Sequence, residues 1–169
     1  MDESMPHADL MHLRFARGWM ELGCAAEARG ELAGLSPRHA ECLDALEVRF
    51  QLLVREQRFA EALPLAQQQQ ARFPQDLRGL MNTGNALFWL GRVQEAVDLV
   101  LPAIQQHPGE TILPYNLACY LVRLGEIHDA KEWLRHAMKV GDQAKVVRHA
   151  LLDADLEPLW PWLRPLAQD

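Results

Sequence analysis

The sequence predicts an all-α protein made of four consecutive helical pairs followed by a capping helix. The first observation is a repeat of 34 residues, which aligns Ala28, Ala62, Ala96 and Ala130. An acidic residue precedes each of these alanines, and a glycine or, once, a glutamine lies five residues before it. The second observation is that apolar residues recur at helical spacing within each unit. Two amphipathic helices joined by a tight turn therefore account for each unit.

The third unit shows the two helices most clearly. Its first apolar run, from Leu80 to Leu87, advances in steps of three and four residues, and Gly91 follows it. A second run begins at Val93 and ends before a His-Pro-Gly sequence. Small residues where the helices cross allow the backbones to approach, and neighbouring pairs must stack because one pair cannot bury its apolar face alone.

The 34-residue spacing also divides the chain into segments. We expect an N-terminal extension over residues 1–8 and one superhelical domain over residues 9–144. A capping helix and a tail rich in proline and tryptophan then occupy residues 145–169. The four expected units of the domain are 9–42, 43–76, 77–110 and 111–144.

The C-terminal segment predicts a cap with an irregular continuation. Asp142 is the expected N-cap of the capping helix, which carries apolar residues such as Val146 on one side. Three prolines in the tail exclude a long regular helix. Because the tail is rich in leucine and tryptophan, we expect it to fold back onto the cap.

The first two units depart from the repeat pattern. Phe50 fills a position that Ala16, Gly84 and Ala118 occupy in the other units, and Arg49 takes a position that is usually apolar. The first unit also ends early, at a Ser-Pro sequence that begins at residue 36. We therefore expect the first two units to pack differently from the others.

Two fragments, MNTGNALFWLGRVQEAVDLVLPAIQQHPGE and PYNLACYLVRLGEIHDAKEWLRHAMKVGD, resemble consecutive tetratricopeptide repeats. The resemblance extends over residues 9–144, and the segment that follows is similar to the C-terminal capping segment of bacterial members of that family. It implies an α-solenoid in which the first helices of the repeats line the concave groove of a right-handed superhelix. In that family the groove holds extended or helical peptide segments.

The candidate binding residues lie on the side of each first helix opposite its packed side, assuming 100° per residue. We name this set the inner stripe. Its apolar residues concentrate in the third and fourth units, and arginines lie at its edges. The inner stripe predicted to bind a peptide comprises Leu13, Arg17, Met20, Gln51, Arg55, Arg78, Met81, Asn82, Asn85, Phe88, Trp89, Ile112, Tyr115, Asn116, Cys119, Val122 and Arg123.

An exposed apolar surface with aromatic and arginine anchors suits an apolar or amphipathic segment of some acidic character. The alternative is that Met81, Phe88, Ile112 and Val122 only pack neighbouring first helices against each other. The three asparagines are either hydrogen-bond partners for a ligand backbone or solvated surface residues. The lysine and arginine partners of the carboxylate clamp found in some members of the family are missing, so no clamp of that type is expected. The positions of those partners hold Leu13, Glu47, Val48 and Ile112.

Composition and motifs exclude several function classes. The formal charge of −6 lacks the basic excess that nucleic-acid binding requires, and no apolar run is long enough for membrane insertion. No metal-binding, cofactor-binding or catalytic motif occurs, so we expect no cofactor, no metal and no enzymatic activity. Cys24, Cys42 and Cys119 are odd in number and far apart, which predicts buried free thiols and a cytoplasmic location.

The sequence therefore predicts a non-catalytic protein–protein interaction module that acts as an adaptor or scaffold and binds a segment in the groove. The alternative is a dedicated chaperone of the secretion type, which shields an apolar segment of one client. The groove has three further possible occupants within the protein itself: the residues before Asp9, the tail from Trp160 to Leu163, and a second copy of the chain.

Overall fold

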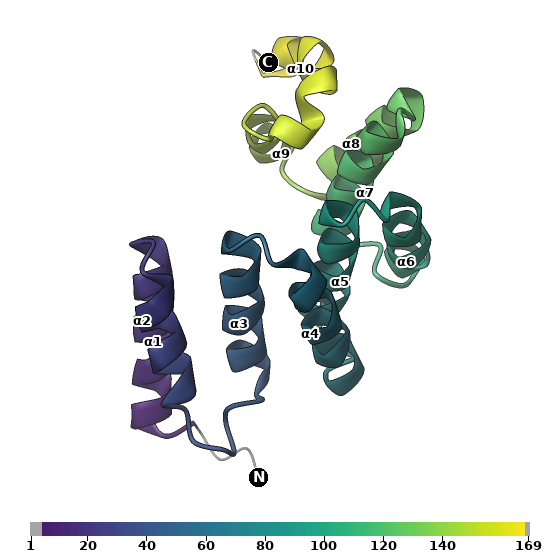
Figure 1. Ribbon diagram of the computed structural model, residues 1–169. Coiled ribbons are helices and arrows are strands. Elements are labelled where there is room, and N and C mark those ends of the chain that lie inside the picture. The colour runs from purple at the N-terminus through teal and green to yellow at the C-terminus, as the bar shows by residue number, and fades with distance from the viewer. Residues whose placement is uncertain (1–4, 168–169) are drawn as a thin grey trace. The chain divides into compact units, whose positions relative to one another are not determined.

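A computed structural model describes residues 5–167 of the chain (Figure 1). Within this range the regular secondary structure is helical throughout, and residues 1–4 of the expected N-terminal extension lie outside it. The chain folds as two compact units, which are larger than the 34-residue units of the repeat pattern. The first compact unit ends at Ala86, and the second begins at Leu87. The helices up to the division are α1 (His7–Glu21), α2 (Ala25–Ala33), α3 (Leu43–Arg55), α4 (Phe59–Arg72) and α5 (Leu77–Trp89), within which the division falls. The second unit continues with α6 (Val93–Gln106), α7 (Ile112–Leu124), α8 (Ile127–Val140), α9 (Gln143–Ala150), the 3₁₀ helix η1 (Ala154–Leu159) and α10 (Trp160–Leu166).

Consecutive helices form pairs because a left-handed residue ends the first helix of each pair. This residue has a φ of +76° at Gly23, +76° at Gly91 and +83° at Gly125. The second pair has Gln57 at the same position, with a φ of +58°. Glycine adopts this conformation without the steric cost that a Cβ atom imposes, so the glycines of the repeat pattern are explained by the turn.

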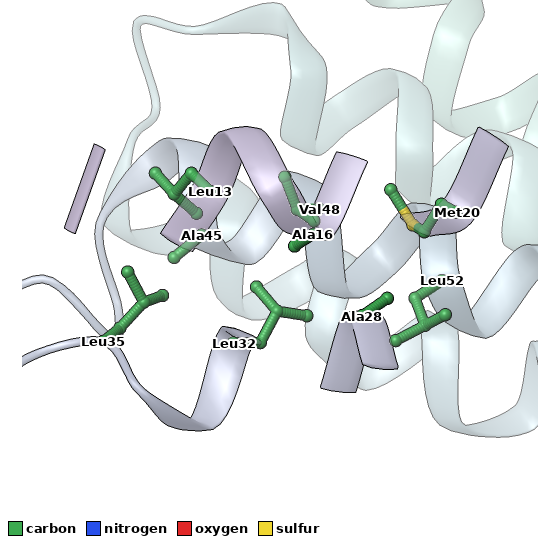
Figure 2. Close-up of a cluster of buried hydrophobic side chains, with 9 residues drawn as sticks. All are labelled: Leu13, Ala16, Met20, Ala28, Leu32, Leu35, Ala45, Val48 and Leu52. Atoms are coloured by element: carbon green, nitrogen blue, oxygen red, sulfur yellow. The ribbon is translucent and has the colours of Figure 1, made fainter. Parts of the chain in front are cut away.

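The aligned alanines lie where the helices of each pair meet. Ala28, Ala62, Ala96 and Ala130 are all fully buried, with 0% of their surface exposed. In the first unit, Ala28 belongs to a cluster of buried apolar side chains from α1, α2, α3 and the segment after α2 (Figure 2). The other members of this cluster are Leu13, Ala16, Met20, Leu32, Leu35, Ala45, Val48 and Leu52.

Helix α2 is short, as the early Ser-Pro sequence predicted. It has 9 residues, whereas α4, α6 and α8 have 14 each. A buried carboxylate fixes the chain after it: Asp9 accepts hydrogen bonds from the backbone nitrogen of Ser36 (2.9 Å) and from its hydroxyl group (2.6 Å). His39 Nδ1 lies 2.8 Å from the same carboxylate. The loop between the first two pairs is therefore held against the start of α1.

The C-terminal segment folds back as expected. Asp142 caps α9, because its carboxylate accepts a hydrogen bond of 3.0 Å from the backbone nitrogen of Lys145. Leu156, Leu159 and Leu163 are fully buried, and α10 packs against both α9 and η1. Among the described helices, none combines the length and the apolar character that spanning a bilayer requires.

Candidate partner-binding surface

The apolar inner-stripe residues of the first unit's first helix are not exposed. Leu13 and Met20 are only 2% and 4% exposed, and both belong to the buried cluster of Figure 2. The expectation of an exposed stripe was therefore wrong for these two residues. The physical reason is that α1 packs against both α2 and α3, so its buried sector is wider than one helical pair alone would require.

Charged residues of the inner stripe form ion pairs at the surface of the first compact unit, which ends at Ala86. Arg78 Nη1 lies 3.0 Å from Asp44, and the Arg78 side chain also donates to Asp76. These carboxylates, Asp76 first, raise the pKa of Arg78, and the hydrogen bonds from Arg78 lower the pKa of Asp76 despite its partial burial. Arg17 lies 3.7 Å from Asp44, and Arg55 donates to the backbone oxygen of Met20.

Asn82 is a structural residue. It is only 8% exposed, and its Nδ2 donates to Glu47 (2.8 Å) and to Oε1 of the fully buried Gln69 (2.9 Å). Both amide protons of Asn82 are therefore used inside the unit, so the predicted contact with a ligand backbone is not supported. Gln51 is exposed and donates to Glu47. Met81 and Asn85 are half-buried.

Phe88 is also buried rather than exposed. It is 3% exposed, with its ring centroid 5.3 Å from that of Tyr120. The guanidinium of Arg123 lies 4.6 Å from the same centroid, within the range of a cation–π interaction. Phe88 therefore packs α5 against α7, which are the first helices of two neighbouring pairs. This is the alternative role that the sequence left open for Phe88.

The C-terminal segment covers Tyr115 and Cys119, which are 5% and 7% exposed. The Tyr115 hydroxyl donates to Asp153 (2.8 Å), and the Cys119 thiol lies 3.8 Å from the same carboxylate. Burial, together with the nearby carboxylates, raises the pKa of both groups. The expected exposure was therefore wrong for Tyr115, whereas Cys119 is buried, as the cysteine pattern predicted. A raised pKa suppresses the thiolate, so Cys119 is a poor nucleophile.

Five inner-stripe residues of the second unit remain accessible. Trp89 and Ile112 are 37% and 39% exposed, Asn116 and Val122 are half-buried, and Arg123 is exposed. Arg123 also pairs with Asp155 at 3.1 Å. The exposed portion of the stripe is thus smaller than the sequence predicted.

Ile112 lies at a pocket of about 310 Å³ between α7 and α9. Its wall combines apolar side chains with a lysine and a histidine. The His149 ring lies 5.2 Å from the Tyr115 ring, centroid to centroid. The lining residues are Thr111, Ile112, Tyr115, Lys145, Val146 and His149. An aliphatic side chain next to a carboxylate would match this surface.

Comparison with known proteins gives a consistent fold. No family model matches the sequence, and no curated protein matches it. Solved structures do: a thermophilic tetratricopeptide repeat protein of Thermus thermophilus has a TM-score of 0.74 at 19% identity, covering 92% of this chain and 82% of that one. The chain has the tetratricopeptide repeat (TPR) fold.

Two further TPR-like structures extend the comparison. YrrB, described as a TPR protein with an unusual peptide-binding site, has a TM-score of 0.63 at 20% identity, over 80% of this chain and 70% of that one. MamA from Desulfovibrio magneticus RS-1, residues 41 to the end, has a TM-score of 0.68 at 12% identity, over 98% and 96%. The expected fold class, an all-α protein of the α-solenoid type, is confirmed, and so is the TPR resemblance at the level of the fold.

All three cysteines are free, but only Cys119 is buried, whereas Cys24 and Cys42 are half-buried. Within residues 5–167, no group of three or more His, Cys, Asp or Glu side chains is placed to hold a metal ion.

The sequence pattern did not identify the residues that the C-terminal segment contributes to this surface. Lys145 and His149 line the pocket, while Asp153 and Asp155 hold the inner side of α7. The amphipathic run at Val146 predicted that a helix packs there. No periodic signal marked the two aspartates, because Asp153 lies in the irregular turn between α9 and η1 and Asp155 lies in the short 3₁₀ helix η1.

Proposed function

We propose that this chain is a non-catalytic protein–protein interaction module, acting as an adaptor or scaffold, that binds an apolar or amphipathic peptide segment of a partner. The observation that carries the proposal is the pocket between α7 and α9, where the exposed Ile112 borders Lys145 and His149. The TPR fold supports it, because a relative with this fold is described as having a peptide-binding site.

The pocket defines the anchor of the partner. A volume of about 310 Å³ is at the lower end of ligand pockets, so it holds one or two side chains rather than a helix. Val146 and Ile112 supply apolar contact, and Lys145 favours a negative group at the rim. The anchor is therefore a branched or aromatic residue next to Asp or Glu. The other accessible contacts within this unit are Trp89, Asn116, Val122 and Arg123.

Selection from a random peptide library displayed on phage tests the proposal. We expect enriched peptides to carry an apolar residue next to an acidic residue. Ile112→Lys places a charge at the apolar wall and should weaken the binding of synthetic versions by at least about tenfold. Lys145→Glu should weaken the same peptides by repelling their acidic residue.

Leu101→Lys is the matched control, because Leu101 is 38% exposed and Ile112 is 39% exposed. Leu101 lies on α6 and does not line the pocket. The control should leave peptide binding unchanged. An absence of enriched peptides, or equal affinity for wild type and Ile112→Lys, would rule out this pocket as the anchor. Tyr115 is unsuitable for such a test, because its substitution also removes a buried hydrogen bond.

The alternative, a chaperone for one client, makes a different prediction in affinity capture of full-length partners. A chaperone should retain one client that is unstable without it, whereas an adaptor should capture partners that are stable alone. We propose the adaptor role, together with a cytoplasmic location. The location is supported by three unpaired cysteines, which are typical of a reducing compartment.

A further inference from the structure

Helix α1 exposes apolar side chains on one face. Phe15, Trp19 and Leu22, the last at its C-cap, are 48%, 37% and 73% exposed. A hollow of about 450 Å³ lies among them, lined also by Arg14, Gly18 and Glu21. Adjacent exposed aromatic and aliphatic residues of this size indicate a contact surface.

The repeat register shows what covers the corresponding face elsewhere in the chain. Phe15, Gly18 and Trp19 align with residues of α7 that are 102 positions later. Those residues are buried where α7 packs against the preceding pair: α6, the second helix of that pair, packs against α7, and the Tyr120 ring lies 5.3 Å from the ring of Phe88 on α5. They are Leu117, Tyr120 and Leu121, which are 0%, 1% and 9% exposed. The face of α1 is thus the continuation of the repeat-stacking interface, at a pair that no described pair precedes.

The hollow has the form that receives a side chain from a second helix. Phe15, Gly18, Trp19 and Leu22 are spaced i, i+3, i+4 and i+7, which is the arrangement of four residues around a hole in knobs-into-holes packing. Apart from its two chain neighbours and the backbone of its own helical turns, a Cβ atom added at Gly18 would meet nothing within 4 Å. Gly18 therefore leaves the centre of the hole open, and the large neighbours form its walls.

The charges beside the hole define the partner further. Arg14 and Glu21 are seven residues apart, so they lie along one edge of the apolar face. Both are exposed, and neither forms an ion pair with another described residue at salt-bridge distance. A helix carrying an acidic and a basic residue seven positions apart would complement both charges.

We propose that this face of α1 docks an amphipathic helix of a partner protein. The partner helix has an aliphatic ridge like that of α6, where Val93, Val97, Val100 and Ile104 are at most 8% exposed. One ridge residue enters the hole at Gly18, and an acidic and a basic residue of the partner face Arg14 and Glu21. The site is separate from the pocket between α7 and α9, and the proposal does not depend on it.

A labelled peptide with the α6 sequence, residues 92–107 with Pro102→Ala to favour a helix, is the probe. We expect saturable binding by fluorescence anisotropy with a Kd below about 100 μM. Gly18→Leu fills the hole and should raise the Kd at least about tenfold. Gly30→Leu is the matched control, because Gly30 is an exposed residue of α2 whose added Cβ also meets nothing within 4 Å. It should leave the Kd unchanged.

Two charged versions of the peptide test whether Arg14 and Glu21 contribute to binding. One carries Gln94→Glu with Leu101→Lys, and the other carries Gln94→Lys with Leu101→Glu. We expect one version to bind at least about threefold more tightly at low salt. The preference should invert in the protein variant Arg14→Glu with Glu21→Arg. Equal Kd values for the two peptides would overturn the charge match.

Three other results would overturn the proposal. The first is no saturable binding up to about 1 mM peptide. The second is binding that Gly18→Leu does not weaken, which would place the peptide elsewhere, for example in the position that α6 occupies against α7. The third is a dimer of the protein, seen by sedimentation velocity, that Gly18→Leu dissociates, because the occupant would then be a second copy of the chain.

Discussion

The hydroxyl group of Tyr115 donates a hydrogen bond of 2.8 Å to the carboxylate of Asp153. This bond joins α7 to the turn between α9 and η1. It gives a buried phenol a carboxylate acceptor that is itself half-buried. The C-terminal segment is therefore fixed to the repeats by a specific polar contact in addition to the apolar contacts of its leucines.

Removing this bond should destabilise the second unit. Tyr115→Phe keeps the ring but loses the donor, and we expect the free energy of unfolding to fall by about 1–2 kcal/mol. Urea unfolding followed by circular dichroism measures the loss. Asp155→Asn breaks only the more exposed pair with Arg123, so its effect should stay within about 0.5 kcal/mol. Equal effects of the two variants would contradict the importance given to burial.

The turn at Gln57 offers a stabilising substitution. Gln57 has a φ of +58°, where a Cβ atom is unfavourable and the other three turns have glycine. We expect Gln57→Gly to raise the free energy of unfolding by about 0.5–1 kcal/mol, after the entropy that glycine adds to the unfolded chain. Gly91→Ala should lower it by about 1 kcal/mol through the same strain, since its added Cβ meets no neighbour. Thermal unfolding measures both, and changes of the same sign would refute this explanation.

The contact between α4 and α5 depends on Gly79. A Cβ atom at this position would lie 2.5 Å from Cα of Gln70, a backbone atom that cannot move alone. We expect Gly79→Ala to destabilise the first unit by about 1–3 kcal/mol. Gly30→Ala, in an open position on α2, should instead stabilise it by up to about 1 kcal/mol. Opposite shifts of the urea midpoint are the expected result, and a neutral Gly79→Ala would mean that the helices separate easily.

Asp9 should make stability depend on acid pH. Hydrogen bonds from Ser36 are the main cause of its lowered pKa, and His39 adds to them. Since the ionised form is favoured in the folded chain, its contribution is complete above the ordinary value of 3.8 and is lost as pH falls through the lowered pKa. The difference in urea midpoint between wild type and Asp9→Asn should therefore shrink below pH 3.8. A difference that stays constant from neutral pH to that range would exclude the carboxylate as its source.

The repeat pattern predicted the packing of the helical pairs well, because that packing depends on residues at fixed spacing. Each aligned alanine is fully buried, and each aligned turn position has a positive φ, including Gln57. The N-cap at Asp142 was predicted for the same reason, since a cap is a local arrangement of backbone and side chain.

The inner stripe was predicted less well, because a helical wheel divides one helix into a packed side and a free side. Helices here have neighbours in several directions. Met20 is covered within the cluster of the first unit, Phe88 packs against Tyr120, and Asp153 bonds to Tyr115. Phe88 and Tyr120 are 32 positions apart, and Tyr115 and Asp153 are 38 positions apart. The period of one helix does not encode contacts over such separations.

The three thiols differ in accessibility, so their rates of chemical modification report on local opening of the structure. Cys24 and Cys42 are half-buried in the first unit, whereas Cys119 is sealed under the C-terminal segment and its burial suppresses the thiolate. A brief pulse of alkylating reagent, read by mass spectrometry, should modify Cys119 only in molecules whose C-terminal end has opened. One sample would then report separately on local opening of the first compact unit and on opening of the C-terminal segment, without any added dye.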